Sequence, residues 1–347
     1  MDKIAIIGLG LIGGSIGLGL KQQKRTDLQV IGFDADVHVG ERAAKRGAVD
    51  KAVWKLPDAV EGAKLIIIAT PVLGIREVLQ TIADMVQPGV VVTDTGGTKR
   101  SVLQWAETYL PEGVSFIGGN PLAGKDQNGI DNARLDLFKN ARYVLIPGKT
   151  ATQESVSVVT NLVEDLGAKP YFLDAYEHDS FAAAMSHLPM LLSEALVAAT
   201  SKSPTSREMS RLASSGYEAT SALAGSDPLT NLDLCMTNRE VVVHWANEAI
   251  FELIRFRDLV NNATDEAGAE ALGVALAKNW EAREIWHTKY LAGDTDDEAQ
   301  KQIKGPTVGE LMADFMMGTK LRERFQKLTT PDAQKEQERR QKRFRRS

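Results

Sequence analysis

A chain of 347 residues, of which 43% are apolar and 25% charged, is long enough for two domains with hydrophobic cores. Its formal net charge of −5 argues against nucleic acid as a partner, because phosphate binding needs a concentrated positive surface. The single cysteine, Cys235, excludes an internal disulfide and a metal site built from several cysteines, and it fits a reducing cytoplasm.

The beginning of the chain has the pattern of a strand, a tight turn and a helix. Residues 3–7 are apolar, and Gly8, Gly10 and Gly13 follow with the spacing G-x-G-x-x-G before a helical pattern. In a dinucleotide site the first glycine allows the turn, the second lets the backbone approach a pyrophosphate, and the third lets the helix pack on the strand. These glycines argue against a signal peptide, and the apolar run LIIIATPVLGI is too short to span a bilayer. We therefore expect a soluble, cytoplasmic protein with no membrane partner.

A second predicted strand, residues 29–33, ends at Asp34, about 20 residues beyond the glycines. A carboxylate at this place accepts hydrogen bonds from the adenosine ribose hydroxyls and repels the 2′-phosphate of NADP. No arginine follows in FDADVH to bind that phosphate. We therefore predict that the cofactor is NAD in preference to NADP.

Further strands are predicted at residues 65–69, 90–93, 115–118, 141–146 and 169–173, with helical patterns between them. This alternation is typical of an α/β fold with a doubly wound, parallel Rossmann sheet. Ligands of such sheets bind beyond the carboxyl ends of the strands. Those ends carry three loops rich in glycine, proline and polar residues: Thr70-Pro71, Asp94-Thr95-Gly96-Gly97 and Gly118-Gly119-Asn120-Pro121.

Strand patterns stop after Asp174, and helices are predicted at residues 178–200, 205–224, 229–259 and 266–291, the first of them kinked at Pro189. A homodimer through these apolar helices would bury their exposed faces. The basic end, KEQERRQKRFRRS, is predicted to be a solvated terminus. The predicted domains are a Rossmann dinucleotide-binding domain (1–175), an all-α substrate and dimerisation domain (176–292) and a charged C-terminal extension (293–347).

Several motifs, in order along the chain, resemble one enzyme family. They are GLGLIGGS, IIIATPV, VTDTGGTK, FIGGNPLAGKDQNGI and SHLPM. Together, over residues 3–260, the sequence resembles the prephenate/arogenate dehydrogenases of tyrosine biosynthesis. The resemblance implies a Rossmann domain joined to a helical dimerisation domain. It also implies NAD(P)-dependent oxidative decarboxylation of prephenate or arogenate to a 4-hydroxyphenyl product.

Four positions depart from the pattern of that family, although Asp94 and Lys99 match it. In the family, a histidine of G-G-H-P contacts the ring hydroxyl that loses a proton, and a serine of D-x-G-S-x-K helps to hold this hydroxyl. A second histidine ends the motif H-L-P-H, and an arginine binds a substrate carboxylate. The corresponding residues here are Asn120 for the first histidine, Gly97 for the serine, Met190 for the histidine that ends H-L-P-H, and Ala222 for the arginine.

Asn120 cannot take a proton, although its amide oxygen can accept a hydrogen bond from the hydroxyl. A positioned base contributes a factor of about 10² to 10⁴ in rate. Because decarboxylation creates an aromatic ring, water is a candidate proton acceptor. His187 is the other candidate, with a purely structural role as its alternative. Lys125 is our first choice for the carboxylate, with the helical residues Arg207, Arg211 and Arg239 as alternatives.

The sequence therefore predicts three sets of site residues and no metal site, since its five histidines are scattered. The predicted catalytic residues are Asn120, His187 and Lys125. The predicted cofactor-binding residues are Gly8, Gly10, Leu11, Ile12, Gly13, Asp34, Thr70, Pro71, Asp94 and Thr95. The predicted substrate-binding residues are Gly97, Asn120, Pro121, Lys125, His187 and Arg239.

Two other functions are open at this stage. The four departures allow a dehydrogenase of the same fold that acts on a different small substrate. They also allow a catalytically inert NAD-binding homologue, which the intact glycines and Asp34 disfavour. A β-hydroxyacid dehydrogenase would need a Lys and an Asn four residues apart on the helix after the Rossmann domain, and residues 178–200 contain neither.

Overall fold

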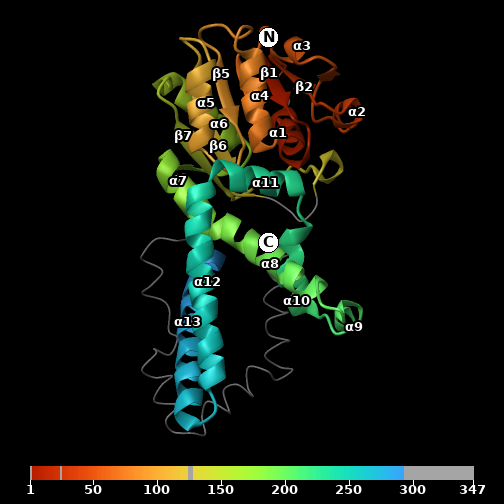
Figure 1. Ribbon diagram of the computed structural model, residues 1–347. Coiled ribbons are helices and arrows are strands. Elements are labelled where there is room, and N and C mark those ends of the chain that lie inside the picture. Colours follow the sequence, from red (N-terminus) through yellow and green to blue (C-terminus); the bar gives the residue numbers. More distant parts are fainter. Residues whose placement is uncertain (1, 24–25, 124–127, 293–347) are drawn as a thin grey trace. The chain divides into compact units, whose positions relative to one another are not determined.

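The structure is a computed structural model, and it describes residues 2–23, 26–123 and 128–292 (Figure 1). The chain forms two compact units that divide between Glu248 and Ala249. The first unit contains the sheet, the helices that surround it and the described residues of the predicted site.

An eight-stranded sheet with the order β3-β2-β1-β4-β5-β6-β7-β8 organises the first unit. Strands β1 to β6 all run parallel to one another. Strand β7 is antiparallel to β6, and β8 is parallel to β7. The predicted doubly wound, parallel sheet is therefore confirmed for most of its strands, and β7 departs from it. In the described part of the β6–β7 connection there is only a short 3-10 turn, η1 (Ile130–Asn132), whereas a parallel return usually runs through an α-helix that packs on the sheet. The strands are β1 (Asp2–Ile7), β2 (Leu28–Phe33), β3 (Lys51–Val53), β4 (Leu65–Ile68), β5 (Val91–Asp94), β6 (Ser115–Pro121), β7 (Arg142–Pro147) and β8 (Lys169–Phe172).

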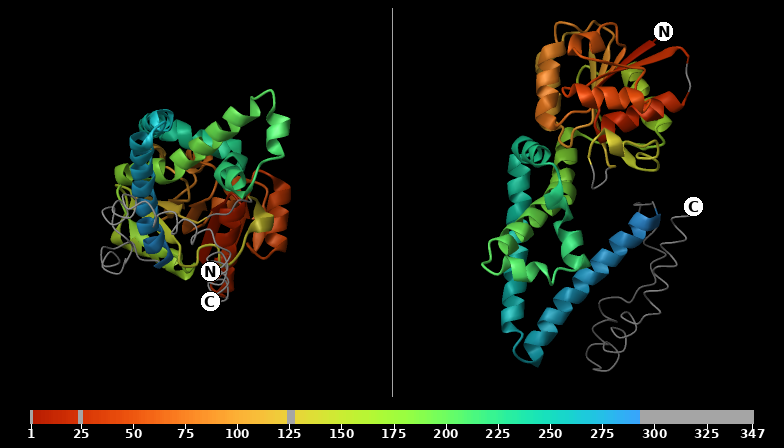
Figure 2. Two further views of the ribbon diagram at one scale, coloured as in Figure 1. Left: turned by 90° about the horizontal axis from the view of Figure 1, so that it is seen from below. Right: turned by 90° about the vertical axis from the view of Figure 1, so that its right-hand side faces the viewer.

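Two hydrophobic cores lie on opposite faces of this sheet. Ile4 and Ile6 of β1 pack in one core with helices α1 and α6, and Ala5 and Ile7 pack in the other with α4 and α5 (Figure 2). Central strands such as β4 are apolar throughout because both of their faces are covered. The helices of this half are α1 (Leu11–Gln22), α2 (Val37–Lys45), α3 (Leu56–Val60), α4 (Val72–Ile82), α5 (Arg100–Tyr109) and α6 (Gln153–Asp165).

The rest of the described chain is helical, which confirms the predicted fold class. The single helix predicted at 178–200 is present and runs from 175 to 201. A π-helical turn ends at His187, two residues before Pro189, where a kink was expected. The helices predicted at 205–224 and 229–259 are wrong as single elements, because the first is broken into short pieces and the second ends and restarts at Asn238. The elements are α7 (Ala175–Ala182), η2 (Ala183–His187), α8 (Leu188–Ser201), α9 (Ser206–Ser210), α10 (Ser215–Ser221), η3 (Ala222–Gly225), α11 (Pro228–Thr237), α12 (Arg239–Asn262) and α13 (Glu266–Ala292).

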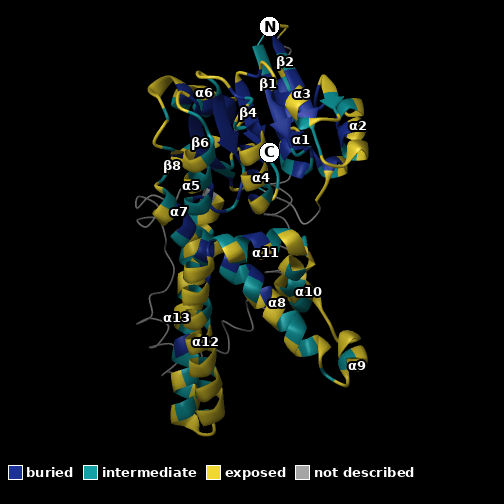
Figure 3. Cartoon of the chain, turned by 45° about the horizontal axis from the view of Figure 1, so that its top comes forward, coloured by how far each residue is buried: buried dark blue, intermediate teal, exposed yellow. Residues whose placement is uncertain are grey.

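Many residues of these helices are exposed (Figure 3). The continuous helix Ala175–Ser201 is long and apolar enough to cross a membrane by length and composition alone, and 22% of its most apolar stretch is buried. This is weak evidence for a membrane span, because a helix that packs on another subunit has the same composition. The predicted domain boundaries stay predictions, and the extension at 293–347 lies outside the described residues.

Candidate active site

The glycine turn between β1 and α1 has the geometry that a dinucleotide needs. Gly8 has a φ of 90°, and a Cβ there would lie 2.6 Å from the carbonyl oxygen of Ala69. A Cβ on Gly13 would lie 1.9 Å from the carbonyl oxygen of Gly8, so the strand and helix touch at this point. A Cβ on Gly10 would meet nothing within 4 Å. The open space is therefore at the one glycine whose backbone must approach a pyrophosphate.

Asp34 lies at the carboxyl end of β2 and is bonded to this turn. Its Oδ2 accepts a hydrogen bond of 2.7 Å from the N–H of Leu9, and its Oδ1 accepts one of 2.9 Å from the N–H of Asp36. Each carboxylate oxygen keeps a second lone pair for a ribose hydroxyl. The residues present thus fit NAD, with Gly10 beside its phosphates and Asp34 beside its ribose. The other predicted contacts lie at the same edge of the sheet: Leu11 and Ile12 begin α1, and Thr70, Pro71 and Thr95 follow β4 and β5.

Asp94 and Lys99 form a fully buried ion pair beneath the loop after β5. Asp94 also accepts hydrogen bonds of 2.7 Å from the N–H of Gly96 and 3.1 Å from the N–H of Gly119. Burial lowers the pKa of the Lys99 ammonium, and the carboxylate of Asp94 opposes this effect. Asp94 therefore holds the loops that carry Gly97 and Asn120 in place, and the cofactor contact predicted for it stays a prediction.

Asn120, at the end of β6, is hydrogen-bonded to a histidine that the sequence analysis did not select. Its Nδ2 lies 2.9 Å from Nε2 of His178, and His178 Nδ1 lies 2.8 Å from Oδ1 of Asp179. Asp179 also accepts hydrogen bonds from the N–H groups of Lys99 (2.7 Å) and Arg100 (3.0 Å) at the start of α5. His178 and Asp179 are buried, with 3% and 0% of their surfaces exposed. In the sequence, the only local indication of this pair is that a histidine and an aspartate are adjacent in a predicted helix.

His187 belongs to the same group of side chains. It ends the π-helical turn η2, and such turns occur frequently at functional sites. It is 1% exposed, and its Nδ1 has no hydrogen-bond partner within the described ranges. Burial lowers its pKa to about 4, while the charge of Asp179 and a hydrogen bond with the backbone of Gly97 oppose this effect. His187, Gly97, Asn120, His178 and Asp179 therefore form one cluster at the carboxyl edge of the sheet.

The remaining predicted substrate residues are distributed differently. Pro121 is buried at the end of β6, opposite Tyr143 of β7. Arg239 begins α12 and lines a separate cavity of about 1130 Å³ together with Arg100 and Tyr176. Lys125 lies outside the described residues. The roles predicted for these residues stay predictions.

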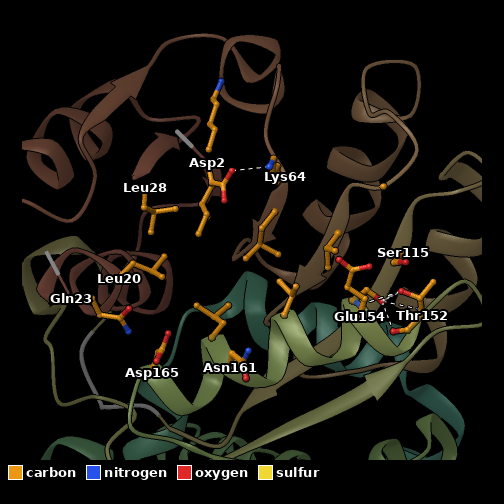
Figure 4. A pocket seen from close by; sticks show the side chains of 18 of the residues that line it. Asp2, Leu20, Gln23, Leu28, Lys64, Ser115, Thr152, Glu154, Asn161 and Asp165 are labelled. Carbon is orange, nitrogen blue, oxygen red and sulfur yellow. Dashed lines mark hydrogen bonds and ion pairs between the residues drawn. The ribbon is translucent and has the colours of Figure 1, made fainter. Parts of the chain in front are cut away.

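A further cavity, of about 630 Å³, lies at the opposite edge of the sheet, where β1 and β4 begin (Figure 4). Its wall includes Asp2, Thr152 and Glu154, and Asp2 Oδ1 lies 2.8 Å from Nζ of Lys64. Ligands of doubly wound sheets bind at the carboxyl ends of the strands, so this cavity is not part of the candidate active site.

Family models match two adjoining parts of the chain. The nucleotide-binding domain of prephenate dehydrogenase matches residues 16–172, and the dimerization domain of prephenate dehydrogenase matches residues 174–273. The prephenate dehydrogenase of Bacillus subtilis (strain 168) is 31% identical over 267 residues, which are 76% of this chain and 72% of that protein. The chain belongs to the prephenate dehydrogenase family. This confirms the resemblance drawn from the motifs, and it makes the chain an NAD-dependent dehydrogenase of that family.

Other members are similar in sequence and in structure. The prephenate dehydrogenase of Lactococcus lactis subsp. cremoris (strain MG1363) is 36% identical over 246 residues, 70% of this chain and 67% of that protein. The crystal structure of Synechocystis arogenate dehydrogenase superposes with a TM-score of 0.67 at 29% identity, over 82% of this chain and 99% of that one. Prephenate dehydrogenase from A. aeolicus, in complex with hydroxyphenyl propionate and NAD+, shares the fold with a TM-score of 0.72 at 23% identity, over 81% of this chain and 98% of that one.

Proposed function

We propose that this protein catalyses the NAD-dependent oxidative decarboxylation of prephenate or arogenate to a 4-hydroxyphenyl product in tyrosine biosynthesis. The observation that supports this most directly is the position of the Asn120 cluster. It lies at the same sheet edge as an open glycine turn and Asp34, so a cofactor and a ring hydroxyl can meet there. Relatives that bear the names prephenate dehydrogenase and arogenate dehydrogenase support the same substrates.

In this reaction Asn120 accepts a hydrogen bond from the ring hydroxyl and orients it. NAD, when bound, supplies the hydride acceptor for the ring carbon that bears this hydroxyl. The substrate's ring carboxylate leaves as CO2, and the electrons of the broken C–C bond complete the aromatic ring. The buried Asp94–Lys99 pair and Asp179 fix the backbone on both sides of the site, so Asn120 needs little rearrangement when substrate binds.

The hydroxyl proton needs an acceptor, and we propose water for this role. Asn120 does not ionise. The pKa of His187, at about 4, makes its imidazole neutral but weakly basic at neutral pH, and a good general base has a pKa near the working pH. His187 is therefore proposed as a neutral hydrogen-bonding group of the site.

Three further features belong to this proposal. Asp34, with both oxygens directed to backbone N–H groups, favours NAD over NADP. Exposed apolar side chains of the helical half, such as Leu229 and Met236, support a homodimer, as does the match to a dimerization domain. A cytoplasmic location remains an expectation from the sequence.

The decisive experiment measures NADH formation by its absorbance with purified protein, NAD, and prephenate or arogenate in parallel. NADP replaces NAD in a second series. Asp34→Ala is the matched variant, which should lower the preference for NAD over NADP while the preference between the two dienes stays the same. If NAD binds and neither diene is oxidised, the altered cluster belongs to a dehydrogenase with a different small substrate, and the proposal fails.

A further inference from the structure

The amide of Asn120 ends a hydrogen-bonded chain that begins at a helix N-terminus. Asp179 accepts the N–H groups of Lys99 and Arg100 at the start of α5, and it accepts a third hydrogen bond from Nδ1 of His178 at 2.8 Å. Nε2 of His178 then lies 2.9 Å from Nδ2 of Asn120. Because His178 and Asp179 are buried, water does not compete for these contacts.

The donors and acceptors of this chain fix the direction of the amide. A carboxylate that accepts three hydrogen bonds has no proton to give, so the ring proton of a neutral His178 sits on Nδ1. Nε2 then offers a lone pair and can only accept. Asn120 must therefore donate with Nδ2, which turns Oδ1 away from His178. Within the described part of the chain, Oδ1 has no hydrogen-bond partner of its own.

We propose that His178 is a positioning residue that holds Asn120 as a hydrogen-bond acceptor toward the ligand, and that protonation of His178 reverses the amide. With both ring nitrogens protonated, Nε2 becomes a donor and requires an acceptor. Rotation of the Asn120 amide brings Oδ1 to Nε2 and presents Nδ2 to the ligand. The substrate hydroxyl, which must donate its proton, then faces the N–H group of Asn120 Nδ2, so two donors meet and no hydrogen bond forms. Protonation of His178 thereby lowers kcat/KM at acid pH, although His178 does not touch the substrate.

Other charged and titratable groups surround His178. Asp179 is its neighbour on α7, His187 comes from η2, and Lys99 comes from the start of α5 with its partner Asp94. His187, with a pKa of about 4, is neutral at neutral pH and so places no charge beside His178 there. The buried Asp94–Lys99 pair carries no net charge. Asp179 is thus the charge in direct contact with His178.

The first test, which rests on the proposed function, compares the pH dependence of kcat/KM in the full-length enzyme and in variants at position 178. The wild-type value should fall on the acid side by about tenfold or more, because one hydrogen bond is replaced by a donor–donor contact. His178→Gln offers Asn120 an amide oxygen that does not titrate, so it should keep most of the activity and lose this acid limb. His178→Leu removes the acceptor and should lower kcat/KM by about tenfold at every pH. His244→Gln, which changes an exposed histidine outside the cluster, should keep the wild-type profile.

The second test needs no turnover. An N–H···N hydrogen bond transmits a scalar coupling between its two nitrogens, which NMR detects in protein labelled with nitrogen-15. The coupling between Asn120 Nδ2 and His178 Nε2 should be present at neutral pH and disappear reversibly on acidification.

The two tests separate the possible failures. A coupling that disappears on acidification, in a protein that oxidises neither diene, supports the amide switch and refutes only the proposed function. If His178→Gln turns over and its kcat/KM still falls at acid pH as in the wild type, the role proposed for His178 is refuted. It is also refuted if the wild-type protein at neutral pH shows no coupling between Asn120 Nδ2 and His178 Nε2.

Discussion

His187 should give the protein a pH-dependent stability that one substitution can isolate. Burial lowers its pKa to about 4, from an ordinary value of 6.5. Between these two pH values the unfolded chain binds a proton at this residue and the folded chain does not. The contribution to stability is therefore fully present above pH 6.5 and is lost as the pH falls toward 4, below which both states are protonated.

The difference of about 2.5 pKa units corresponds to about 3 kcal/mol of unfolding free energy. The assay is urea unfolding at a series of pH values from neutral to about 4, at one protein concentration, because assembly changes apparent stability. His187→Leu removes the titrating group and leaves an apolar side chain of similar size. The variant should lose about 3 kcal/mol less than the wild type between pH 6.5 and 4.

Only the pH dependence is compared, so a constant change in stability caused by the substitution does not affect the result. His38→Gln is the matched control, since the side chain of His38 is 80% exposed. If His187→Leu and wild type lose the same free energy on acidification, the burial of His187 does not depress its pKa and the reasoning is refuted.

Three other substitutions test the rest of the site. Gly10→Ala should leave the unfolding free energy within about 1 kcal/mol of wild type and weaken NADH binding, measured by fluorescence titration, because its methyl enters open space reserved for phosphate. Gly13→Ala should yield little folded protein by circular dichroism, since its Cβ would lie 1.9 Å from a backbone oxygen. Lys99→Met should lower the unfolding free energy in urea by about 3–5 kcal/mol, because it leaves the buried carboxylate of Asp94 without its counter-ion. Equal NADH affinity in Gly10→Ala and wild type, or an unchanged stability in Lys99→Met, would contradict these readings.

The nucleotide half was predictable because its signals are local. Each central strand is a short apolar run, and each turn carries glycine, proline or aspartate at the place where the chain must change direction. Gly8 and Gly13 are required by contacts between neighbouring elements, so their spacing alone indicates the turn. The direction of β7 was not predictable in this way, because the length and composition of a connection do not fix whether the chain returns parallel or antiparallel.

The candidate cluster around Asn120 was only partly predictable because its contacts join distant segments. Asn120 and His178 are 58 residues apart, and their hydrogen bond depends on how α7 docks on the sheet edge. The break at Asn238 has the same origin. No glycine or proline marks it, and the side chain of Asn238 instead donates a 2.7 Å hydrogen bond to the carbonyl oxygen of Asp179. One buried residue thus ends a helix and supports the cluster, and neither role leaves a local pattern.

The departures from the family pattern are matched by other side chains in the same places. Where the family has a serine, a Cβ on Gly97 would lie 2.7 Å from Cδ2 of Leu234, so an apolar side chain fills that space. Met190, in place of a histidine, is buried, with 5% of its surface exposed. Asn120 is hydrogen-bonded to His178 and has not lost its polar partner. At Gly97 and Asn120 the altered residue thus has a neighbour of matching chemistry, an apolar side chain in one case and a hydrogen-bond partner in the other. Compensation at these two positions favours a working enzyme with a rearranged hydroxyl site over an inert homologue.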